Sequence, residues 1–209
     1  MKSAKILVLI AVLLIPGLNI YAGPLPDTGQ TKCYNNTVEI PCPSPGEAFY
    51  GQDAQYQGPV RSYTKLGQNG VLLADTATQE SGWLMTRDNV TGLIWEMKTD
   101  DNSIHDKDNT YTWANAQSMF IATLNQQNFG GYSDWRLPTR AEFQSAIQGA
   151  TLPTLSVGTY LYWTSEKQGN RAWAVTIATD ANGSVIPSQS GGTSLILQTS
   201  FVHAIATRP

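Results

Sequence analysis

Acidic side chains concentrate in one polar loop, residues 99–110, which holds the residues best suited to bind a metal ion. Asp106 and Asp108 alternate with other polar residues, and Asp100 and Asp101 come just before them. Carboxylate oxygens clustered in a loop are the ligands that Ca²⁺ prefers. The spacing is not that of an EF-hand, because no glycine stands at the sixth position and no glutamate closes the loop. The sequence therefore predicts either a structural calcium site at these four aspartates or a solvated acidic loop.

Residues of the kind used in catalysis are few, and we predict that the protein is not an enzyme. The sequence contains no Gly-x-Ser-x-Gly, Gly-x-x-x-x-Gly-Lys or His-Glu-x-x-His motif. Its two histidines, His105 and His203, lie in the acidic loop and in a terminal segment with a strand-like pattern. A hydrolase is an alternative, since four carboxylates could pair as they do in a glycosidase. These are Glu96, Asp134, Glu142 and Glu166.

The chain has two cysteines, Cys33 and Cys42, and we predict that they form a disulfide bond. An even number of cysteines in an exported protein indicates disulfide pairing. Their spacing, with no histidine nearby, disfavours the alternatives of a metal pair or a redox pair. The bond would close a short loop, for which the expected stabilisation is about 2–3 kcal/mol.

The first 22 residues have the order of parts found in a cleavable signal peptide. Lys2 and Lys5 precede an apolar stretch, residues 6–15, and the small residue Ala22 stands before the expected cut. The apolar stretch is far shorter than the roughly 20 residues that span a bilayer, and an uncleaved anchor is the less favoured alternative. We therefore expect an exported protein in the periplasm, at the cell surface or in the medium, with no membrane span in its mature chain.

The mature chain is expected to comprise an arm, residues 23–60, and one domain, residues 61–209. Prolines and glycines fill the arm and exclude long helices from it. Two of the 13 Lys and Arg residues leave with the signal peptide, so 11 basic residues stand against 16 acidic ones, a net charge of about −5. Because phosphate binding needs clustered Lys and Arg, we expect no nucleic-acid partner.

The domain alternates short apolar runs with turn residues, as expected for an α+β fold with two helices and several short antiparallel strands. Thr112 caps the first predicted helix, 113–124, in which apolar residues recur at spacings of three and four. Thr139 and Glu142 form a capping box ahead of the second helix, which continues to Ile147. Strands are predicted at 72–74, 82–85, 93–97, 160–164, 171–177, 194–197 and 201–206.

Four phrases in the domain are more specific than this pattern. They are Asp88-Asn-Val-Thr-Gly-Leu-Ile-Trp95, Thr110-Tyr-Thr-Trp-Ala-Asn-Ala116, Gly130-Gly-Tyr-Ser-Asp-Trp-Arg-Leu-Pro-Thr139 and Tyr162-Trp-Thr-Ser165. Together they closely resemble the DUF1566 family, which is also named for the C-terminal domain of the Legionella collagen-like adhesin. The resemblance covers about residues 75–208, and the arm is similar to a segment that often precedes this domain.

The resemblance implies an exported bacterial protein with a C-type lectin-like fold, related to the formylglycine-generating enzyme. The adhesin's domain is implied to form a homo-trimer and to bind sulfated glycosaminoglycans. The enzyme's late cysteine pair and the lectins' sugar-binding triplets around calcium have no counterpart in this sequence, so neither chemistry carries over. The net negative charge also disfavours a sulfated ligand, unless a trimer gathers the basic residues.

Eleven residues of these phrases are expected to build the domain rather than to contact a ligand. The tryptophans among them can each bury on the order of 150–250 Å². Arg136 can tie loop carbonyls or a carboxylate with its five donors, and Pro138 fixes the chain before a helix. The full set is Asp88, Thr91, Gly92, Trp95, Trp113, Asp134, Trp135, Arg136, Pro138, Trp163 and Trp173. The alternative for any one of the tryptophans is stacking against a ligand.

The sequence favours an exported, non-enzymatic binding module that recognises a glycan, a surface polymer or a protein partner at the cell envelope. Aromatic side chains near the helices and the late strands would supply the binding surface: Tyr111, Tyr132, Tyr160 and Tyr162. The alternative is a structural subunit of a surface appendage that docks through the arm. Neither interpretation requires a cofactor, apart from the predicted calcium ion.

Overall fold

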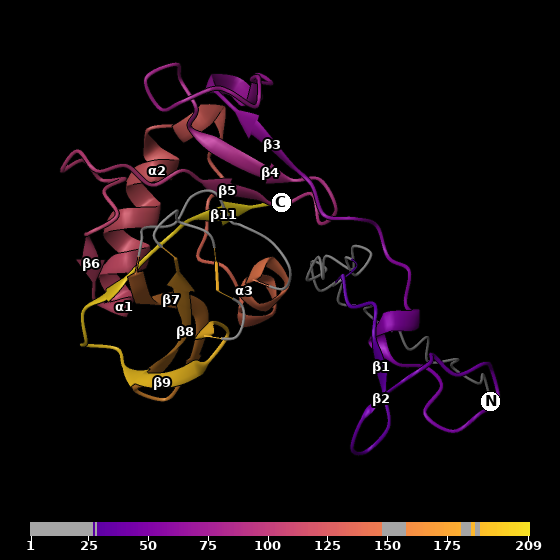
Figure 1. Ribbon diagram of the computed structural model, residues 1–209. Coiled ribbons are helices and arrows are strands. Elements are labelled where there is room, and N and C mark those ends of the chain that lie inside the picture. Colours follow the sequence, from indigo (N-terminus) through magenta and orange to yellow (C-terminus); the bar gives the residue numbers. More distant parts are fainter. Residues whose placement is uncertain (1–26, 28, 148–157, 181–184, 187–188) are drawn as a thin grey trace, which may run out of the picture.

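The computed structural model describes residues 27, 29–147, 158–180, 185–186 and 189–209. The predicted signal peptide, residues 1–22, and the first residues of the arm, 23–26, lie outside this part of the chain. Within it the protein is α+β, with two helical segments and three mainly antiparallel sheets (Figure 1). The predicted fold class is thereby confirmed.

The largest sheet has five strands in the order β6-β10-β7-β8-β9. Its centre is a long antiparallel hairpin of β7 (Gly158–Gln168) and β8 (Arg171–Thr179), whose β-branched and aromatic residues favour strands. On one side β9 (Thr193–Leu197) pairs with β8, and on the other β10 (Val202–His203) lies between β7 and β6 (Thr110–Tyr111). The β10–β7 pair is parallel, and the β10–β6 pair is antiparallel.

A second sheet, in the order β11-β5-β4-β3, brings the beginning and the end of the domain together. β3 (Tyr63–Leu66) pairs with β4 (Met85–Asp88), β4 pairs with β5 (Ile94–Glu96), and β5 pairs with β11 (Thr207–Arg208). All three pairings are antiparallel.

The turn between β4 and β5 forms as the Asp-Asn-Val-Thr-Gly phrase predicts. Asp88 Oδ1 accepts the backbone N–H groups of Val90 and Thr91 at 2.9 and 3.2 Å. Gly92 adopts a φ of 77°, a conformation that residues with a Cβ atom rarely take. Its N–H donates to the Asp88 carbonyl at 2.7 Å, which closes the turn.

The first helical segment starts where predicted but is not uniformly α-helical. Thr112 Oγ1 accepts the N–H of Asn115 at 3.3 Å, which confirms the predicted cap. α1 (Trp113–Asn115) then passes into a π-helical turn, Ala116–Ile121, and into α2 (Ala122–Gln126). A π-helical turn is rare inside an α-helix, and the apolar spacing of the sequence did not predict it.

The second helix, α3 (Arg140–Ile147), begins with the predicted capping box. The N–H of Glu142 donates to Thr139 Oγ1 at 3.2 Å, and Glu142 Oε2 accepts the N–H of Thr139 at 2.8 Å. Its buried residues include Phe143 and Ala146, which pack against the five-stranded sheet. In the part of the chain that the structure describes, no helix is both long enough and apolar enough to cross a bilayer.

The core of the domain consists of two hydrophobic clusters, one on each face of the β7–β8 hairpin. Tyr162 and Trp163 are neighbours in the chain but belong to different clusters, because successive side chains of a strand point to opposite faces. Trp163 packs with Phe120 of the first helical segment, and Tyr162 packs with Phe143 of α3. Each helix therefore covers one face of the sheet.

The arm has a small structure of its own. β1 (Cys33–Tyr34) and β2 (Glu39–Ile40) form a hairpin, and the predicted disulfide between Cys33 and Cys42 is present. The N–H of Asp27 donates to the carbonyl of Pro59 at 3.1 Å, which joins the two ends of the arm. In Figure 1 the hairpin lies apart from the domain, and an extended stretch of chain leads from the arm to β3.

A buried ion pair fixes the place where the arm enters the domain. The Arg61 guanidinium donates to the carboxylate of Asp88, and both side chains are almost fully buried. The same guanidinium donates to the carbonyl of Ser145 near the end of α3 at 2.5 Å. Next to it, the N–H of Asn89 donates to the Ser62 carbonyl at 2.9 Å.

The predicted strands differ from the observed ones mainly at their ends. The predictions at 160–164, 171–177 and 194–197 fall within β7, β8 and β9, and the prediction at 93–97 contains β5. The predictions at 72–74 and 82–85 are wrong, since Leu72 only bridges to Leu66 and β4 begins at Met85. Only two residues of the predicted segment 201–206 form a strand. Strand ends depend on partners that are distant in sequence, which a local pattern does not reveal.

Candidate functional site

The acidic loop that follows β5 is closed by its own backbone. The N–H of Thr99 donates to the His105 carbonyl at 3.0 Å, and the N–H of Lys107 donates to the Thr99 carbonyl at 2.9 Å. These two bonds hold the ends of the loop together.

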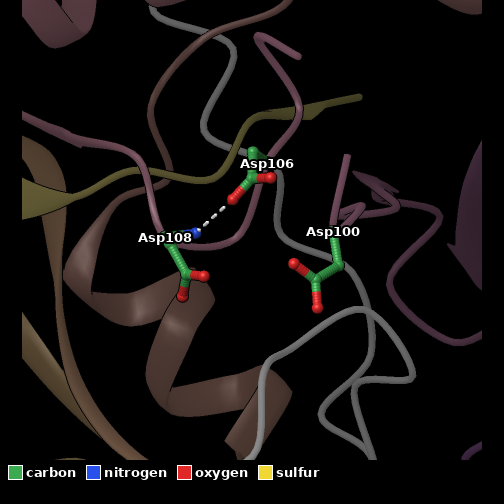
Figure 2. A group of neighbouring side chains, drawn as sticks. All are labelled: Asp100, Asp106 and Asp108. Carbon is green, nitrogen blue, oxygen red and sulfur yellow. Dashed lines mark hydrogen bonds between the residues drawn. The ribbon is translucent and has the colours of Figure 1, made fainter. Parts of the chain in front are cut away.

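Three of the four predicted calcium ligands come together in this loop. One carboxylate oxygen each of Asp100, Asp106 and Asp108 lies within 4.8 Å of the others, and Figure 2 shows the three side chains around a common space. Asp106 Oδ1 accepts the N–H of Asp108 at 2.8 Å, and Oδ2 accepts the N–H groups of Asp101 and Asn102 at 2.9 and 2.6 Å. Backbone hydrogen bonds, first those from Asp108 and Asn102, hold the pKa of Asp106 below its usual value.

A lysine of the same loop already neutralises part of this cluster. Lys107 Nζ lies 2.7 Å from Asp108 Oδ2 and 3.3 Å from Asp100 Oδ1, and the hydrogen bond to Asp108 contributes most to raising the pKa of the lysine. The fourth predicted ligand, Asp101, points elsewhere: Oδ1 accepts from Thr99 Oγ1 at 2.7 Å. Hydrogen bonds from Ser103 and Thr99 lower the pKa of Asp101 to about 2. The calcium site stays a prediction, with three candidate ligands in place and an internal cation beside them.

Both histidines of the chain anchor this loop, a role that the sequence did not predict. His105 Nδ1 lies 2.8 Å from Oε1 of Glu96, a fully buried carboxylate in β5. Glu96 also contacts Lys98 Nζ at 3.4 Å and accepts the N–H of Ala206 at 3.1 Å. The signal in the sequence was the acidic residue inside the apolar phrase Leu-Ile-Trp-Glu-Met, since buried charges in strands are almost always paired.

The second histidine holds the loop from the five-stranded sheet. His203 Nδ1 lies 3.0 Å from the carbonyl oxygen of Lys107, and the ring packs against Tyr160 and Tyr162. Burial lowers the pKa of His203, so the ring is neutral at pH 7. The acidic loop is therefore fixed to the core at two points rather than free to rearrange.

The other carboxylates proposed for a hydrolase are held in ion pairs with arginines. Arg136 binds Glu142 through two nitrogens at 2.6 and 2.8 Å, as its five donors led us to expect. In the same way, Arg208 binds Asp134. The hydrogen bonds from Arg208 lower the pKa of Asp134. A glycosidase needs one carboxylic acid that stays protonated near neutral pH, and these two groups are shifted in the opposite direction.

A further ion pair joins the start of α3 to the end of β7. Arg140 Nε and its backbone N–H both donate to Glu166 Oε2, at 2.8 and 2.9 Å. The guanidinium also stacks on the ring of Trp173, 4.3 Å from its centroid. These contacts tie the helix to the sheet and leave the carboxylate engaged.

The four predicted ligand-binding tyrosines do not form one exposed surface. Tyr162 is buried and packs against Phe143, so the prediction that it contacts a ligand is corrected: it is a core residue. Tyr111 stacks on Phe120, and Tyr132 lies under the guanidinium of Arg208 at 3.8 Å. Tyr160, like Tyr162, packs against the ring of His203.

Most motif tryptophans are structural, as expected. Trp95, Trp135 and Trp163 are buried, and the indole N–H groups of the last two donate to backbone carbonyls at 3.0 and 2.8 Å. Trp113 and Trp173 are half-buried, and each is covered by a cationic side chain rather than open to a ligand. The alternative of a ligand-stacking tryptophan gains no support from these contacts.

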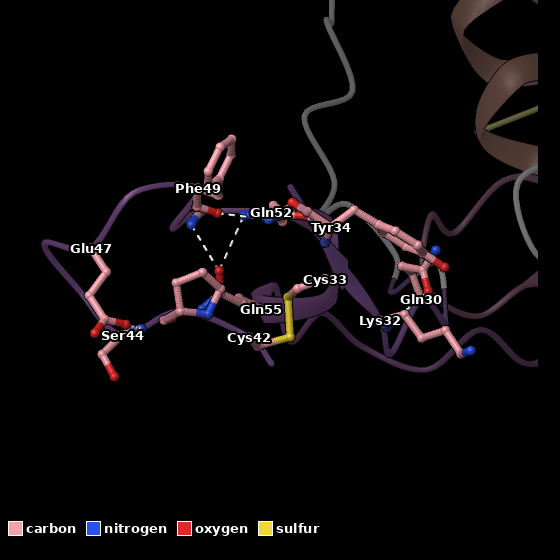
Figure 3. The surroundings of a disulfide bond; sticks show 12 residues. Gln30, Lys32, Cys33, Tyr34, Cys42, Ser44, Glu47, Phe49, Gln52 and Gln55 are labelled. Atoms are coloured by element: carbon pink, nitrogen blue, oxygen red, sulfur yellow. Dashed lines mark hydrogen bonds between the residues drawn. A yellow bond between two sulfur atoms is a disulfide. The ribbon is translucent and has the colours of Figure 1, made fainter. Parts of the chain in front are cut away.

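Among the described residues, four exposed aromatic side chains lie in the arm, and one, Phe201, lies in the domain. Tyr34, Phe49, Tyr50 and Tyr56, all in the predicted arm, are 43–50% exposed. Figure 3 shows the rings of Tyr34 and Phe49 pointing away from the disulfide. The signal available in the sequence was the presence of aromatic residues in a segment too short to form a core.

The domain is α+β, and its acidic loop is fixed to the core. The sequence matches the family of the Lcl C-terminal domain over residues 84–196, more than half of the chain, so the chain belongs to this family. This is the DUF1566 family, and the resemblance is thereby confirmed. No curated protein matches the chain.

Proposed function

We propose that this protein is an adhesin-like, non-enzymatic binding module that is exported to the bacterial cell envelope, where it recognises a glycan, a surface polymer or a protein. The observation that carries the proposal is the family membership of the domain, which is shared with the C-terminal domain of a collagen-like adhesin. The disulfide bond of the arm supports an oxidising location outside the cytoplasm.

The contacts of the acidic side chains support binding rather than hydrolysis. Glu142, Glu166 and Asp134 each face an arginine, and Glu96 is buried beneath the acidic loop. An ionised carboxylate held by a guanidinium is a poor general acid, because the ion pair favours its charged form. The same ion pairs stiffen the loops and present a fixed surface, which reduces the entropy lost on binding.

Binding of the protein without residues 1–22 to a glycan and glycosaminoglycan array tests the proposal. We expect specific binding to at least one glycan class and no turnover of the bound glycans. Release of shortened oligosaccharides would contradict the non-enzymatic function. Absence of binding to every glycan would direct the search to protein partners.

The same array, run in calcium and again in EDTA, tests the proposed calcium site. If the ion organises the binding surface, the double variant Asp100→Asn/Asp108→Asn should lose binding as the wild type does in EDTA. Glu80→Gln with Asp75→Asn is the matched control, since it removes two exposed carboxylates far from this loop in the sequence. Binding that is unchanged in EDTA would exclude a role for calcium in recognition.

A further inference from the structure

We infer that the arm, residues 27–60, carries a recognition site of its own for neutral polysaccharide, presented by the rings of Tyr34, Phe49 and Tyr50. This inference rests on the proposed binding function and moves part of it from the domain to the arm. It follows from the way the arm is stabilised, from the exposure of its rings, from the backbone of Phe49 and from the charge of the segment.

The arm is organised without a hydrophobic core. The disulfide closes its hairpin. The side-chain amide of Gln52 forms hydrogen bonds with both backbone groups of Tyr34, as the backbone of a neighbouring strand would. Gln52 Oε1 accepts the N–H of Tyr34, and Nε2 donates to the Tyr34 carbonyl, both at 2.8 Å. Nε2 also donates to the carbonyl of Phe49 at 2.8 Å, so one amide joins the backbones that carry two of the rings. The platform therefore exists before any ligand binds.

The rings are on the surface of this platform. Tyr34 is 43% exposed, Phe49 45% and Tyr50 50%, whereas Cys33 and Pro43 are the buried apolar residues of the described part of the arm. Exposed apolar groups on a fixed scaffold are candidates for an interaction site. Aromatic rings also suit such a site because few torsions are frozen on binding.

The backbone of Phe49 shows that its exposure is built into the fold. Phe49 has a φ of 66°, the left-handed region that bulky residues avoid. The Gln52 bond holds its carbonyl in that conformation, and in Figure 3 the ring projects from the chain away from the disulfide. Strained conformations persist where the surrounding structure imposes them, and they gather at binding sites.

The charge of the arm narrows the class of ligand. Between residues 27 and 60, four acidic residues stand against one basic residue, Lys32, whose ammonium lies 2.7 Å from Glu39. A segment with this balance repels sulfated or phosphorylated polymers. The rest of its surface is rich in Asn, Gln, Ser and Thr, whose side chains can both donate and accept hydrogen bonds. The aromatic rings can stack on the C–H faces of sugar rings, and the amides and hydroxyls can form hydrogen bonds with the sugar hydroxyl groups. This combination fits an uncharged polysaccharide.

Affinity electrophoresis of the protein without residues 1–22 tests the inference. The gels contain dextran, laminarin or galactomannan as neutral polymers, and heparin as the polyanion. Phe49→Gly is the main variant, because it removes the ring while glycine accepts the positive φ without strain, so the arm should stay folded. Tyr50→Ala is the second variant, and Val60→Ala, at an 82% exposed residue of the same segment, is the control.

We expect retardation by at least one neutral polymer, weakened about tenfold in Phe49→Gly and in Tyr50→Ala and unchanged in Val60→Ala. Thiol titration should show that the disulfide stays closed in every variant. The inference is overturned if no neutral polymer retards the protein, if only heparin does, or if the two ring variants bind as well as the wild type. Equal loss in Val60→Ala would also overturn it.

The two proposals fail in different ways. Glycan binding on the array that survives the ring variants would remove the arm site and keep the proposed function of the protein. If the array shows no glycan binding of any kind, the arm site is excluded together with a carbohydrate ligand, and a protein partner is the remaining form of the proposed function.

Discussion

In the domain, Trp95, Trp163 and Phe143 are fully buried, whereas in the arm Phe49 and Tyr50 are about half exposed. The domain has two sheets and two helices with which to enclose its aromatic rings. The arm is too short to enclose a core, so a disulfide and side-chain amides stabilise it and its rings face solvent. The comparison indicates that most aromatic residues of the domain stabilise its core, whereas those of the arm are exposed.

Removing one ring from each region should give the largest difference in stability. Trp163→Ala should lower the free energy of unfolding by about 3–5 kcal/mol, because it opens a cavity between β7 and the first helical segment. Tyr50→Ala in the arm should change it by less than about 0.5 kcal/mol, since an exposed ring has little packing to lose. Urea denaturation followed by circular dichroism measures both. Similar losses in the two variants would refute the division of roles.

Removing the disulfide should have an intermediate effect on stability. Replacing Cys33 and Cys42 together with serine should destabilise the arm by about 2–3 kcal/mol, because the unfolded arm gains loop entropy. Hydrogen exchange of the backbone of residues 29–59 should speed up accordingly. The urea midpoint of the domain should not move, and a clear decrease would show that the arm is a structural part of the domain.

The smallest expected effect concerns Glu142, whose interactions make the stability of the domain depend on pH in the acidic range. Burial alone would raise the pKa of Glu142, but hydrogen bonds from Arg136 and Thr139 lower it below the usual value of 4.5. The unfolded chain therefore takes up this proton at a higher pH than the folded protein does. The stabilisation is fully present above about pH 4.5 and is lost as the pH falls through the lower pKa of the folded state.

Glu142→Gln should lower the free energy of unfolding by about 1 kcal/mol at pH 7 and reduce its decline between pH 4.5 and pH 3. Urea denaturation at pH 7, 4.5 and 3 measures this difference. Glu80→Gln is the control, since it removes a carboxylate that is exposed. If the free energy of unfolding of Glu142→Gln declines between pH 4.5 and pH 3 as steeply as that of the wild type, the ion pair with Arg136 does not contribute to stability.

Local features of the fold could be predicted because their atoms are close in the sequence. The caps at Thr112 and Thr139 and the turn at Asp88 each join residues two or three positions apart. Strand β3 and the short strand β11 escaped prediction, since their pairing partners come from distant parts of the chain. The π-helical turn escaped prediction because such turns are rare and the apolar residues were read with α-helical spacing.

The candidate site could be predicted only in part for the same reason. Asp100, Asp106 and Asp108 lie in one loop, so their proximity follows from the sequence. The sequence did not show that Lys107 would neutralise two of them, or that His203 would hold the loop from a strand 96 positions further on. The burial of Tyr162 likewise depends on α3, which packs across its strand.

The sequence by itself determined the family, the disulfide, the helix caps and the α+β class, because each of these rests on residue types at short, fixed spacings. Only the tertiary structure decided which aromatic rings are buried and which carboxylates are paired. The exposure of a side chain and the pairing of a charge depend on neighbours from the whole chain. A tyrosine is therefore a core residue at position 162 and a surface residue at position 50. The tertiary structure thus showed the exposed rings of the arm, on which the recognition site proposed there rests.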